Sequence, residues 1–312
     1  FTSCGSESDN WAIVRGAQSM SKKGKHVISS TVEHDAVRKS LDELERQGFE
    51  VTRLHPEADG SISVDAVRNA LRKDTILVSL MMVNNETGAV TDIAAISRML
   101  KAERSMALLH TDAVQSFLKV PFKASALGAD MISISAHKIH GPKGVGALYI
   151  RKGVKIKPRT FGGEQEMKIR PGTEAMPAIA GFAAAAKAMP DPQKELEHIR
   201  MLRDYMVSKF EEIGDIVINS PPDALPYVTN ISVLGIKSEP MLNFLSDKGI
   251  CVSGGSASSK GKKSHVLMQM GLDRRRLDSP IRISFSRFTT IQEIDALILG
   301  ITEGKKVIRA LK

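Results

Sequence analysis

The sequence predicts an α/β fold with a mostly parallel sheet, followed by a smaller α+β domain. Strand-like and helix-like segments alternate through the first part of the chain, which is typical of a sheet whose strands run parallel. Ile76–Val83 is an apolar run interrupted only by Ser79, as expected for a strand buried on both faces. Met-Pro-Asp-Pro at 189–192 then breaks the pattern. We therefore place a large domain at residues 1–190 and a small one at residues 191–312.

The elements of the large domain are predicted from hydrophobic periodicity, which is 2 residues for strands and 3.6 for helices. Val37, Leu41 and Leu44 recur at helical spacing, and Gly48 follows as a stop signal. The predicted strands are His26–Ser30, Glu50–Leu54, Ile76–Val83, Met106–His110, Met131–Ser135 and Val145–Ile150. The predicted helices are Asp35–Gln47, Val64–Arg72, Asp92–Glu103 and a buried, alanine-rich helix over Ala175–Ala188.

The small domain is predicted to begin with a long helix. Asp191 is its expected N-cap, Pro192 its first residue, and it reaches about Phe210. Short strands separated by helices follow, at Asp215–Asn219, Val228–Leu234, Ile250–Ser253 and Ile281–Phe285. The last helix is expected to begin near Thr290.

Composition excludes several classes of protein. The 312 residues contain no apolar run of the roughly 18 residues needed to span a bilayer, so we predict no membrane segment. The formal charge is +9, but three Tyr and one Trp offer few stacking groups, and we predict no nucleic-acid partner. We interpret the basic clusters as solvated surface, with attraction for acidic partners as the alternative. Two distant cysteines predict no metal site and a cytoplasmic location.

Polar side chains gather just past three predicted strands. Asn84, Asn85 and Glu86 follow the first, Asp112 and Gln115 the second, and Ser135, His137 and Lys138 the third. In open α/β sheets, ligands bind beyond the carboxyl ends of the strands. These three groups therefore indicate one site at that edge of the sheet.

Each group has a chemical role that it can fill. A partly desolvated lysine, such as Lys138, forms Schiff bases. An aspartate facing a pyridine nitrogen keeps that nitrogen protonated. The small hydroxyl residues of 2–8 (Thr-Ser-Cys-Gly-Ser-Glu-Ser), just before a predicted helix, suit a phosphate. Arg287 is a candidate to bind a substrate carboxylate.

These segments resemble the cysteine desulfurases (NifS/IscS-like) of class V of the pyridoxal-5′-phosphate (PLP) aminotransferase superfamily. The resemblance covers nearly the whole chain, and the order and spacing of its segments make it specific. The segments are 1–10 (Phe-Thr-Ser-Cys-Gly-Ser-Glu-Ser-Asp-Asn), Glu33-His34, 83–86 (Val-Asn-Asn-Glu), 110–116 (His-Thr-Asp-Ala-Val-Gln-Ser), 135–144 (Ser-Ala-His-Lys-Ile-His-Gly-Pro-Lys-Gly), 161–165 (Phe-Gly-Gly-Glu-Gln), 170–173 (Arg-Pro-Gly-Thr) and 286–290 (Ser-Arg-Phe-Thr-Thr).

The resemblance implies a fold type I large domain, a homodimer, L-cysteine as substrate and a role in sulfur metabolism and iron–sulfur cluster assembly. It also implies a role for each site residue. Lys138 would bind PLP covalently, His34 would stack on its ring and move protons, Asp112 would pair with the pyridine nitrogen, and Gln115 would contact the ring hydroxyl. Gly5, Ser6, Ser135, His137 and the partner subunit's Thr173 would hold the phosphate, and Asn85 and Arg287 would bind the substrate carboxylate, with Asn85 also near the cofactor.

The sequence departs from the family at the sulfur-accepting cysteine, because Gly-Ser-Ala-Cys is replaced by Gly-Ser-Ala-Ser, which ends at Ser258. A serine hydroxyl cannot form a persulfide. Four interpretations stay open: an engineered substitution, a natural enzyme for another substrate such as selenocysteine, another cysteine in this role, or a non-catalytic PLP-binding subunit that docks sulfur-acceptor or scaffold proteins. We interpret Cys251 as part of a buried strand and Cys4 as part of the phosphate loop.

Family members have several tens of residues before the phosphate loop. We therefore expect the natural protein to extend before Phe1.

Overall fold

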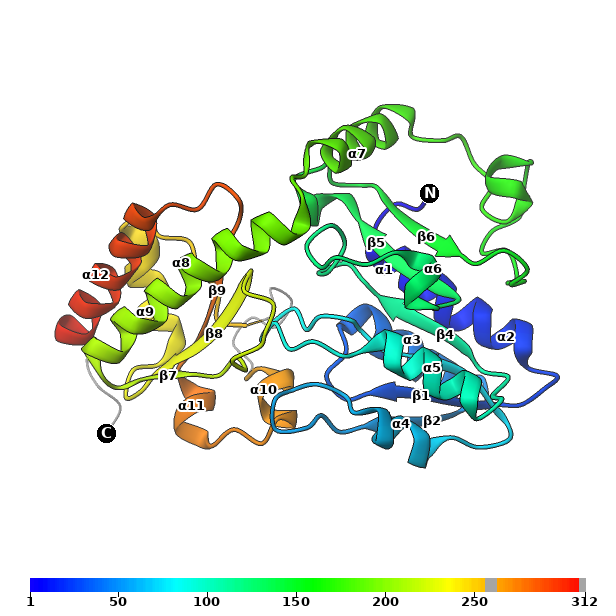
Figure 1. The fold of residues 1–312 in the computed structure, drawn as a ribbon, viewed down its shortest axis with the longest axis horizontal. Coiled ribbons are helices and arrows are strands. Elements are labelled where there is room, and N and C mark those ends of the chain that lie inside the picture. Colours follow the sequence, from blue (N-terminus) through cyan, green and yellow to red (C-terminus); the bar gives the residue numbers. More distant parts are fainter. Residues whose placement is uncertain (256–262, 309–312) are drawn as a thin grey trace. The chain divides into compact units, whose positions relative to one another are not determined.

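The computed structural model of the protein describes residues 1–255 and 263–308. The chain divides into two compact units, each with its own sheet and helices (Figure 1). The first unit comprises Phe1–His55, Ile62–Val83 and Thr91–Pro192, and the second comprises Pro56–Ser61, Asn84–Val90 and Gln193–Lys312.

The first unit is built on a six-stranded sheet in the order β2-β1-β3-β4-β5-β6. Its strands are β1 (His26–Ser30), β2 (Glu50–Leu54), β3 (Thr75–Ser79), β4 (Leu108–Asp112), β5 (Met131–Ser135) and β6 (Gly146–Ile150). The pairings from β2 through β5 are parallel, and only β6 runs antiparallel to its neighbour. The predicted α/β fold with a mostly parallel sheet is therefore confirmed.

Helices of the first unit connect these strands. The chain begins with α1 (Gly5–Asn10), the π-helix η1 (Trp11–Arg15) and α2 (Gly16–Met20), which continue one another because the residues at both junctions keep right-handed helical dihedrals. The others are α3 (Asp35–Arg46), α4 (Val64–Ala70), α5 (Ile93–Ala102), α6 (Ala124–Leu127), the 3₁₀ turns η2 (Ala136–Ile139) and η3 (Gln165–Lys168), and α7 (Met176–Ala188).

The core of the first unit forms where α3 and the first helical stretch meet the sheet. Val37, Leu41 and Leu44 of α3 are fully buried and pack in one cluster with Ile13 and Ile76. Their helical spacing puts them on one face of α3, which explains why the periodicity predicted this helix. Burial of such side chains contributes about 1.5–3 kcal/mol each.

The second unit contains an antiparallel sheet in the order β7-β8-β9. Its strands are β7 (Ile216–Ile218), β8 (Val228–Val233) and β9 (Pro280–Ser284), and its helices are α8 (Pro192–Ile213), α9 (Ser238–Asp247), α10 (His265–Gln269), α11 (Arg274–Asp278) and α12 (Ile291–Val307). Thr290 caps α12 in a reciprocal pair with Glu293, which confirms the predicted start of the last helix. Among the described residues, no helix is both long and apolar enough to span a bilayer.

The structure corrects the prediction for two strands. β3 ends at Ser79 rather than at Val83. Leu80 and Met82 still donate backbone hydrogen bonds to His110 and Asp112 of β4, whereas the N–H of Met81 bonds with both carboxylate oxygens of Glu33. The predicted strand Ile250–Ser253 is reduced to one backbone bridge, between Ser253 and Arg282. Cys251 is exposed, so its interpretation as part of a buried strand was wrong.

The alanine-rich helix α7 is present but is not buried in this chain. Phe182 is the one residue of α7 that is buried, while Met176 at its start is 62% exposed. One face of the helix packs on η2 through Phe182, which lies in a buried cluster with Ala136 and Ile139. The approach is close at Gly181, where a side chain would meet Pro142. The other faces of α7 therefore remain uncovered, and the prediction of a buried helix was wrong.

Candidate active site

Two parallel strands bring predicted site residues to one edge of the sheet. β4 and β5 pair with His110 opposite Met131 and Asp112 opposite Ser133, so both strands end at nearly the same level. Their last residues are Asp112 and Ser135. Because side chains alternate along a strand, His110 and Asp112 lie on one face of β4. This edge is the place where α/β sheets bind ligands.

The first helical stretch begins directly beside this edge. Backbone hydrogen bonds in both directions between Thr2 and Gly146, each 2.9 Å, hold the chain next to β6 just before the helix. A Cβ atom on Gly5 would lie 2.7 Å from Cγ2 of Val114 and 3.6 Å from Cβ of Ser135. Only glycine therefore permits this close approach. The N-cap, Cys4, makes no side-chain cap, which leaves the first-turn N–H groups available to an anion.

Further anion-binding groups stand beside this helix start. The hydroxyl of Ser135 lies 2.8 Å from Nδ1 of His137. Burial lowers the pKa of His137, and the charges of nearby lysines, first Lys138 and then Lys143, lower it further. If the hydroxyl donates to Nδ1, the Nε2–H of the neutral imidazole is left to donate to a phosphate; in the other tautomer, the hydroxyl is left to donate. The structure thus brings Gly5, Ser135 and His137 together as predicted.

Asp112 is a buried carboxyl at the centre of the group. Its Oδ1 accepts a hydrogen bond of 2.9 Å from the N–H of Val114. Burial raises the pKa of Asp112, and the Val114 bond and the charges of His34 and Lys138 oppose this increase. His34 and Lys138 therefore act electrostatically on the same carboxyl.

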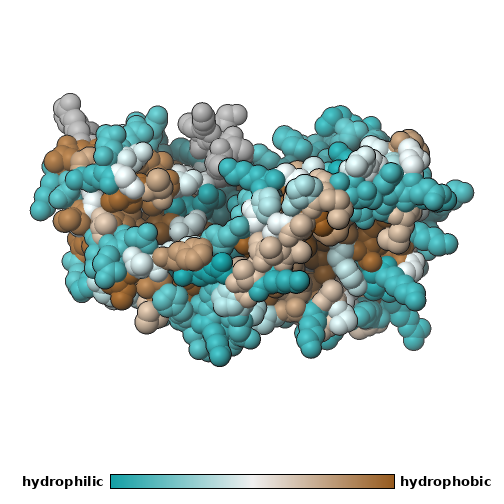
Figure 2. Space-filling view, turned by 90° about the horizontal axis from the view of Figure 1, so that it is seen from above, coloured by the Kyte–Doolittle hydropathy of each residue, from teal (hydrophilic) through white to brown (hydrophobic). Residues whose placement is uncertain are grey.

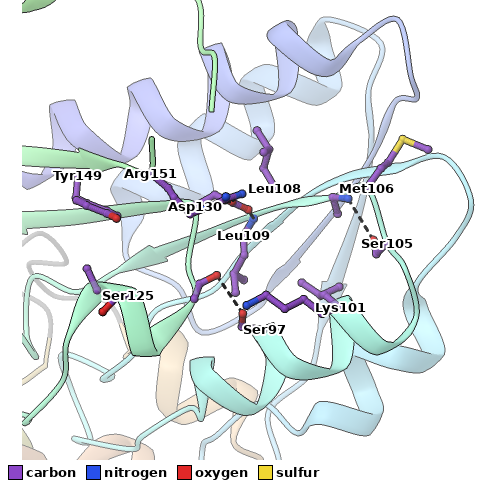
Figure 3. A pocket seen from close by; sticks show the side chains of 14 residues that line it. Ser97, Lys101, Ser105, Met106, Leu108, Leu109, Ser125, Asp130, Tyr149 and Arg151 are labelled. Atoms are coloured by element: carbon purple, nitrogen blue, oxygen red, sulfur yellow. Dashed lines mark hydrogen bonds and ion pairs between the residues drawn. The ribbon is translucent and has the colours of Figure 1, made fainter. Parts of the chain in front are cut away.

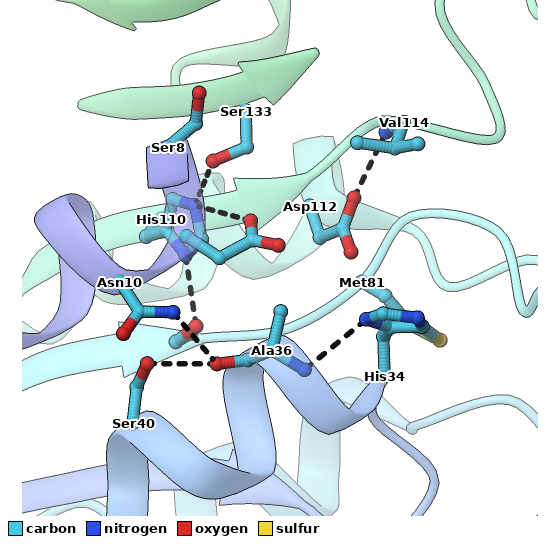
Figure 4. A network of polar contacts seen from close by, with 12 residues as sticks. Ser8, Asn10, His34, Ala36, Ser40, Met81, His110, Asp112, Val114 and Ser133 are labelled. Atoms are coloured by element: carbon cyan, nitrogen blue, oxygen red, sulfur yellow. Dashed lines mark hydrogen bonds and ion pairs between the residues drawn. The ribbon is translucent and has the colours of Figure 1, made fainter. Parts of the chain in front are cut away.

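His34 is oriented by the start of α3. It is the N-cap of that helix, and its Nδ1 accepts a hydrogen bond of 3.1 Å from the N–H of Ala36 (Figure 4). A neutral ring with Nδ1 as acceptor carries its proton on Nε2. The half-buried imidazole is thus fixed in both position and tautomer.

Lys138 lies on the short turn η2, directly after β5. Two backbone hydrogen bonds close this region, from Ala136 to Val145 (3.2 Å) and from Gly141 to Ala136 (3.0 Å). The side chain of Lys138 is half-buried. Gln115 is also half-buried, in the turn after β4, and its predicted contact with a cofactor hydroxyl stays a prediction.

A row of buried polar side chains lies one level below Asp112 on the same face of the sheet. Nδ1 of His110 is 2.8 Å from the hydroxyl of Ser79, and Nε2 is 2.9 Å from the hydroxyl of Ser133 (Figure 4). Burial lowers the pKa of His110 to about 3, so its ring is neutral. His110, the last residue of the predicted strand Met106–His110, is thus a buried residue of β4.

Two buried carboxyls beside this group were not recognised from the sequence as site residues. Asp9 of α1 is 1% exposed, with Oδ1 3.7 Å from Nε2 of His110. Glu33, directly before His34, is 3% exposed. The position of each acid could have indicated its burial. Asp9 comes shortly before the apolar residues that begin at Trp11, and Glu33 follows the buried end of β1.

Other predicted site residues belong to the second unit or to exposed loops. Asn85 is half-buried, and its carbonyl accepts a hydrogen bond of 3.1 Å from Nη1 of Arg282. Arg287 stacks on Phe288, with Cζ 4.8 Å from the ring centroid. Thr173 is exposed in the loop before α7. The proposed approach of all three residues to the Lys138 group stays a prediction, and Ser258 lies outside the described residues.

A hollow of about 460 Å³ lies at the opposite edge of the same sheet, near the start of β4 (Figure 3). Its polar groups already serve the fold. Asp130 accepts hydrogen bonds from the N–H of Leu109 and from Arg151, and Ser97 donates to the carbonyl of Gly128. The edge that carries Asp112 and Lys138 is therefore the better candidate for chemistry.

Residues 1–297 match the family model described as aminotransferase class-V. The chain belongs to this family. It is 42% identical, over 307 residues, to a cysteine desulfurase IscS of Vibrio atlanticus. The aligned region covers 96% of this chain and 75% of that relative.

Solved structures of the same family are close to this chain. A NifS-like protein superposes with a TM-score of 0.92 at 36% identity, over 98% of this chain and 82% of that one. A structure of SspA in complex with cysteine gives a TM-score of 0.80 at 33% identity, over 93% and 81% of the two chains. The resemblance to cysteine desulfurases and the fold expected from it are confirmed. Members of this family use PLP.

We predict that His110 stays neutral in the folded protein far below the pH at which a free histidine titrates. Its ring resonances in histidine-labelled protein should not shift between pH 7 and pH 4, whereas N-acetylhistidine in the same tube titrates near 6.5. Because the folded-state pKa is depressed, stability contributed by His110 is present above pH 6.5 and is lost as the pH falls toward 3. Titration of His110 near pH 6 would contradict the buried row.

Proposed function

We propose that the chain binds PLP through Lys138 and acts on L-cysteine or a close analogue. The observation that carries this proposal is the buried Asp112, with the charges of His34 and Lys138 acting on it, beside an uncapped helix start at Gly5. Bound PLP supplies an electron sink for bonds broken at the substrate's carbon atoms.

The residues present fit PLP by their chemistry and by their spacing. The closeness that requires glycine at position 5 brings helix N–H groups, the Ser135 hydroxyl and His137 to one place, as a phosphate needs. Ser6, exposed in the first turn, can add its hydroxyl. A buried carboxyl such as Asp112 is the group that keeps a pyridine nitrogen protonated.

The remaining residues would orient the ring and move protons. His34, whose Nδ1 is already occupied by Ala36, presents Nε2–H to the ring and the substrate. The amine of Lys138 would hold the cofactor and afterwards accept or return a proton. Gln115 would bind the ring hydroxyl, and Asn85 and Arg287 would bind the substrate carboxylate.

The substrate class follows from the relatives. One is named a cysteine desulfurase, and another has been solved in complex with cysteine. In the desulfurase reaction, the carbon–sulfur bond of L-cysteine breaks and sulfur bonds to an acceptor thiol, giving L-alanine and a persulfide. Residue 258 offers no thiol in this chain, so the acceptor thiol must come from elsewhere, such as a sulfur-acceptor protein.

Ser258 also supports a second candidate function. A PLP enzyme whose substrate carries a better leaving group, such as selenocysteine, needs no nucleophilic cysteine at this position. A PLP-binding subunit that only docks acceptor or scaffold proteins is the non-catalytic form of the same proposal. The free cysteines Cys4 and Cys251 fit the reducing cytoplasm that we propose for the protein.

We also propose that the protein is a homodimer whose interface includes α7. Figure 2 looks onto α7 from above and shows a tan to brown area there, which indicates apolar side chains at the surface. Met176 is 62% exposed, and Phe161 and Met167 before it are 87% and 83% exposed. Large apolar side chains that are this exposed mark candidate protein interfaces. Thr173 lies in the same region, as expected if it reaches the partner's phosphate site.

Replacement of Lys138 should abolish covalent cofactor binding. Protein incubated with PLP should show a visible absorbance band that L-cysteine alters, and Lys138→Ala should lack this band because it has no amine to bind the cofactor. Lys143→Ala, which removes an exposed lysine five residues away, is the matched control and should keep the band. A band that persists in Lys138→Ala would refute the assignment.

Ser258→Cys should convert the chain into a sulfur-transferring enzyme. The variant should form alanine from L-cysteine over many turnovers and carry a persulfide at residue 258, because a thiolate is accessible near its pKa of about 8.5. Ser258→Ala should behave like the natural chain. If Ser258→Cys yields neither alanine nor persulfide, the desulfurase proposal fails and the second candidate gains support.

The dimer should depend on the apolar surface before and along α7. In sedimentation experiments, the natural chain should sediment as a dimer, and the double variant Phe161→Asp, Met176→Asp should sediment as a monomer, since buried charges oppose association. Met201→Asp, at a residue of α8 that is 52% exposed, is the control. A natural chain that stays monomeric at all concentrations would contradict the proposal.

A further inference from the structure

Three carboxyl groups are buried close together in the first unit. Asp9, Glu33 and Asp112 are 1%, 3% and 7% exposed. In the described part of the chain, neither Asp9 nor Glu33 has a lysine or arginine within ion-pair distance. Burial of an unpaired carboxylate costs several kcal/mol, and three ionised carboxylates would also repel one another.

Glu33 ties together two strand ends beside His34. Its Oε1 and Oε2 accept hydrogen bonds of 3.1 and 3.0 Å from the N–H of Met81, which follows β3. The hydroxyl of Ser30, the last residue of β1, donates to Oε1 at 2.6 Å. The next residue, His34, caps α3. The Glu33 side chain therefore fixes the short loop from which His34 projects.

Asp9 is as deeply buried as Glu33, and both Asp112 and Glu33 act on it electrostatically. Its Oδ1 is buried without a hydrogen-bond partner in the described structure, and it lies 3.7 Å from Nε2 of His110. The His110 ring is neutral and cannot balance a negative charge on Asp9. The hydroxyl of Ser133 is the polar group that contacts the Asp9 carboxyl.

The groups that shift the pKa of Asp112 differ from those that shift the pKa values of Asp9 and Glu33. Burial, with the Asp112 charge as the next cause, raises the pKa of Asp9 well above its usual range, and Glu33 and Cys4 raise it further. Burial raises the pKa of Glu33 to about 8; the bonds from Ser30 and Met81 oppose this increase, and the Asp112 charge adds to it. Asp112 instead has His34 and Lys138 beside it, and both oppose the increase in its pKa.

We propose that Asp9 and Glu33 are positioning residues held as neutral acids, which leave the buried negative charge on Asp112 and, through Glu33, hold His34 in place. This proposal rests on the proposed function in one respect: the proposed cofactor is the group that Asp112 and His34 would face. One carboxylate, rather than three, would then meet the protonated pyridine nitrogen. The other two acids would add no charge beside it, and Glu33 would still accept the hydrogen bonds of Met81 and Ser30.

The protonation of Glu33 is testable in the full chain without cofactor. The folded-state pKa of about 8 is above the ordinary value of 4.5, so stability contributed by Glu33 is full below pH 4.5 and is lost as the pH rises through 8. Between pH 4.5 and pH 8, the unfolding equilibrium constant of the chain with Glu33 should rise about tenfold per pH unit because of this group. Glu33→Gln should remove this contribution. Urea unfolding from pH 4.5 to pH 8.5 measures it. Asp35→Asn, at the neighbouring surface acid, should leave the slope unchanged.

Cofactor absorbance tests the positioning role. Glu33→Gln and Asp9→Asn, which are neutral and nearly isosteric, should keep the affinity for PLP and the pH midpoint of its absorbance. Glu33→Leu removes the acceptor of the bonds from Met81 and Ser30 and so frees the His34 loop. PLP affinity should therefore fall about tenfold, and the midpoint should shift. Circular dichroism establishes that each variant folds.

Several outcomes would overturn the inference. Equal pH slopes for the natural chain and Glu33→Gln would show that Glu33 is ionised. A shift of the midpoint in both amide variants as large as in Glu33→Leu would show that the charges themselves are needed. If the natural chain binds no PLP, the proposed function fails, and the unfolding series alone then decides whether Glu33 is a neutral acid.

Discussion

The parallel pairing of β4 with β5 is the constraint on which the candidate site depends. It places Asp112, the last residue of β4, opposite Ser133, two residues before β5 ends at Ser135 and leads into the turn that carries Lys138. A slip of one residue would turn His110 and Asp112 to the other face of the sheet. The row formed by Ser79, His110 and Ser133 opposes such a slip, since it joins three strands through the two nitrogens of one buried ring.

The helix start at Gly5 is held in place in a similar way, and it positions the groups that would bind a phosphate. The backbone bridge between Thr2 and Gly146 fixes where the chain enters the helix, and the absence of a side chain at Gly5 lets it approach Val114 and Ser135. Sheet register and helix position together set the group that the family likeness associates with PLP. Ser258 changes what the site can do with sulfur but not how this group is assembled, because all these contacts lie within the first unit.

Sequence periodicity predicted the sheet and most helices because burial alternates regularly there: β2 and β5 have the predicted bounds, and α3 ends within one residue of them. Position after a strand predicted Asp112, Ser135 and Lys138 as neighbours. Periodicity could not predict that Glu33 would take the N–H of Met81 just past the end of β3, since that contact joins residues 48 apart. It also could not show that most residues of the apolar helix α7 are exposed in a single chain. An apolar composition predicts that a helix is covered, but it does not show whether the same chain or another chain covers it.

The turn that carries Lys138 has a consequence for how a bound molecule could be exchanged. Its backbone is closed on both sides by hydrogen bonds to Val145 and Gly141, and it ends at His140 in the left-handed conformation. The main chain at this position is therefore a fixed anchor point. A molecule attached to Lys138 could therefore be moved only by rotation about the bonds of the lysine side chain. The length of that side chain sets the distance over which such a molecule could be exchanged.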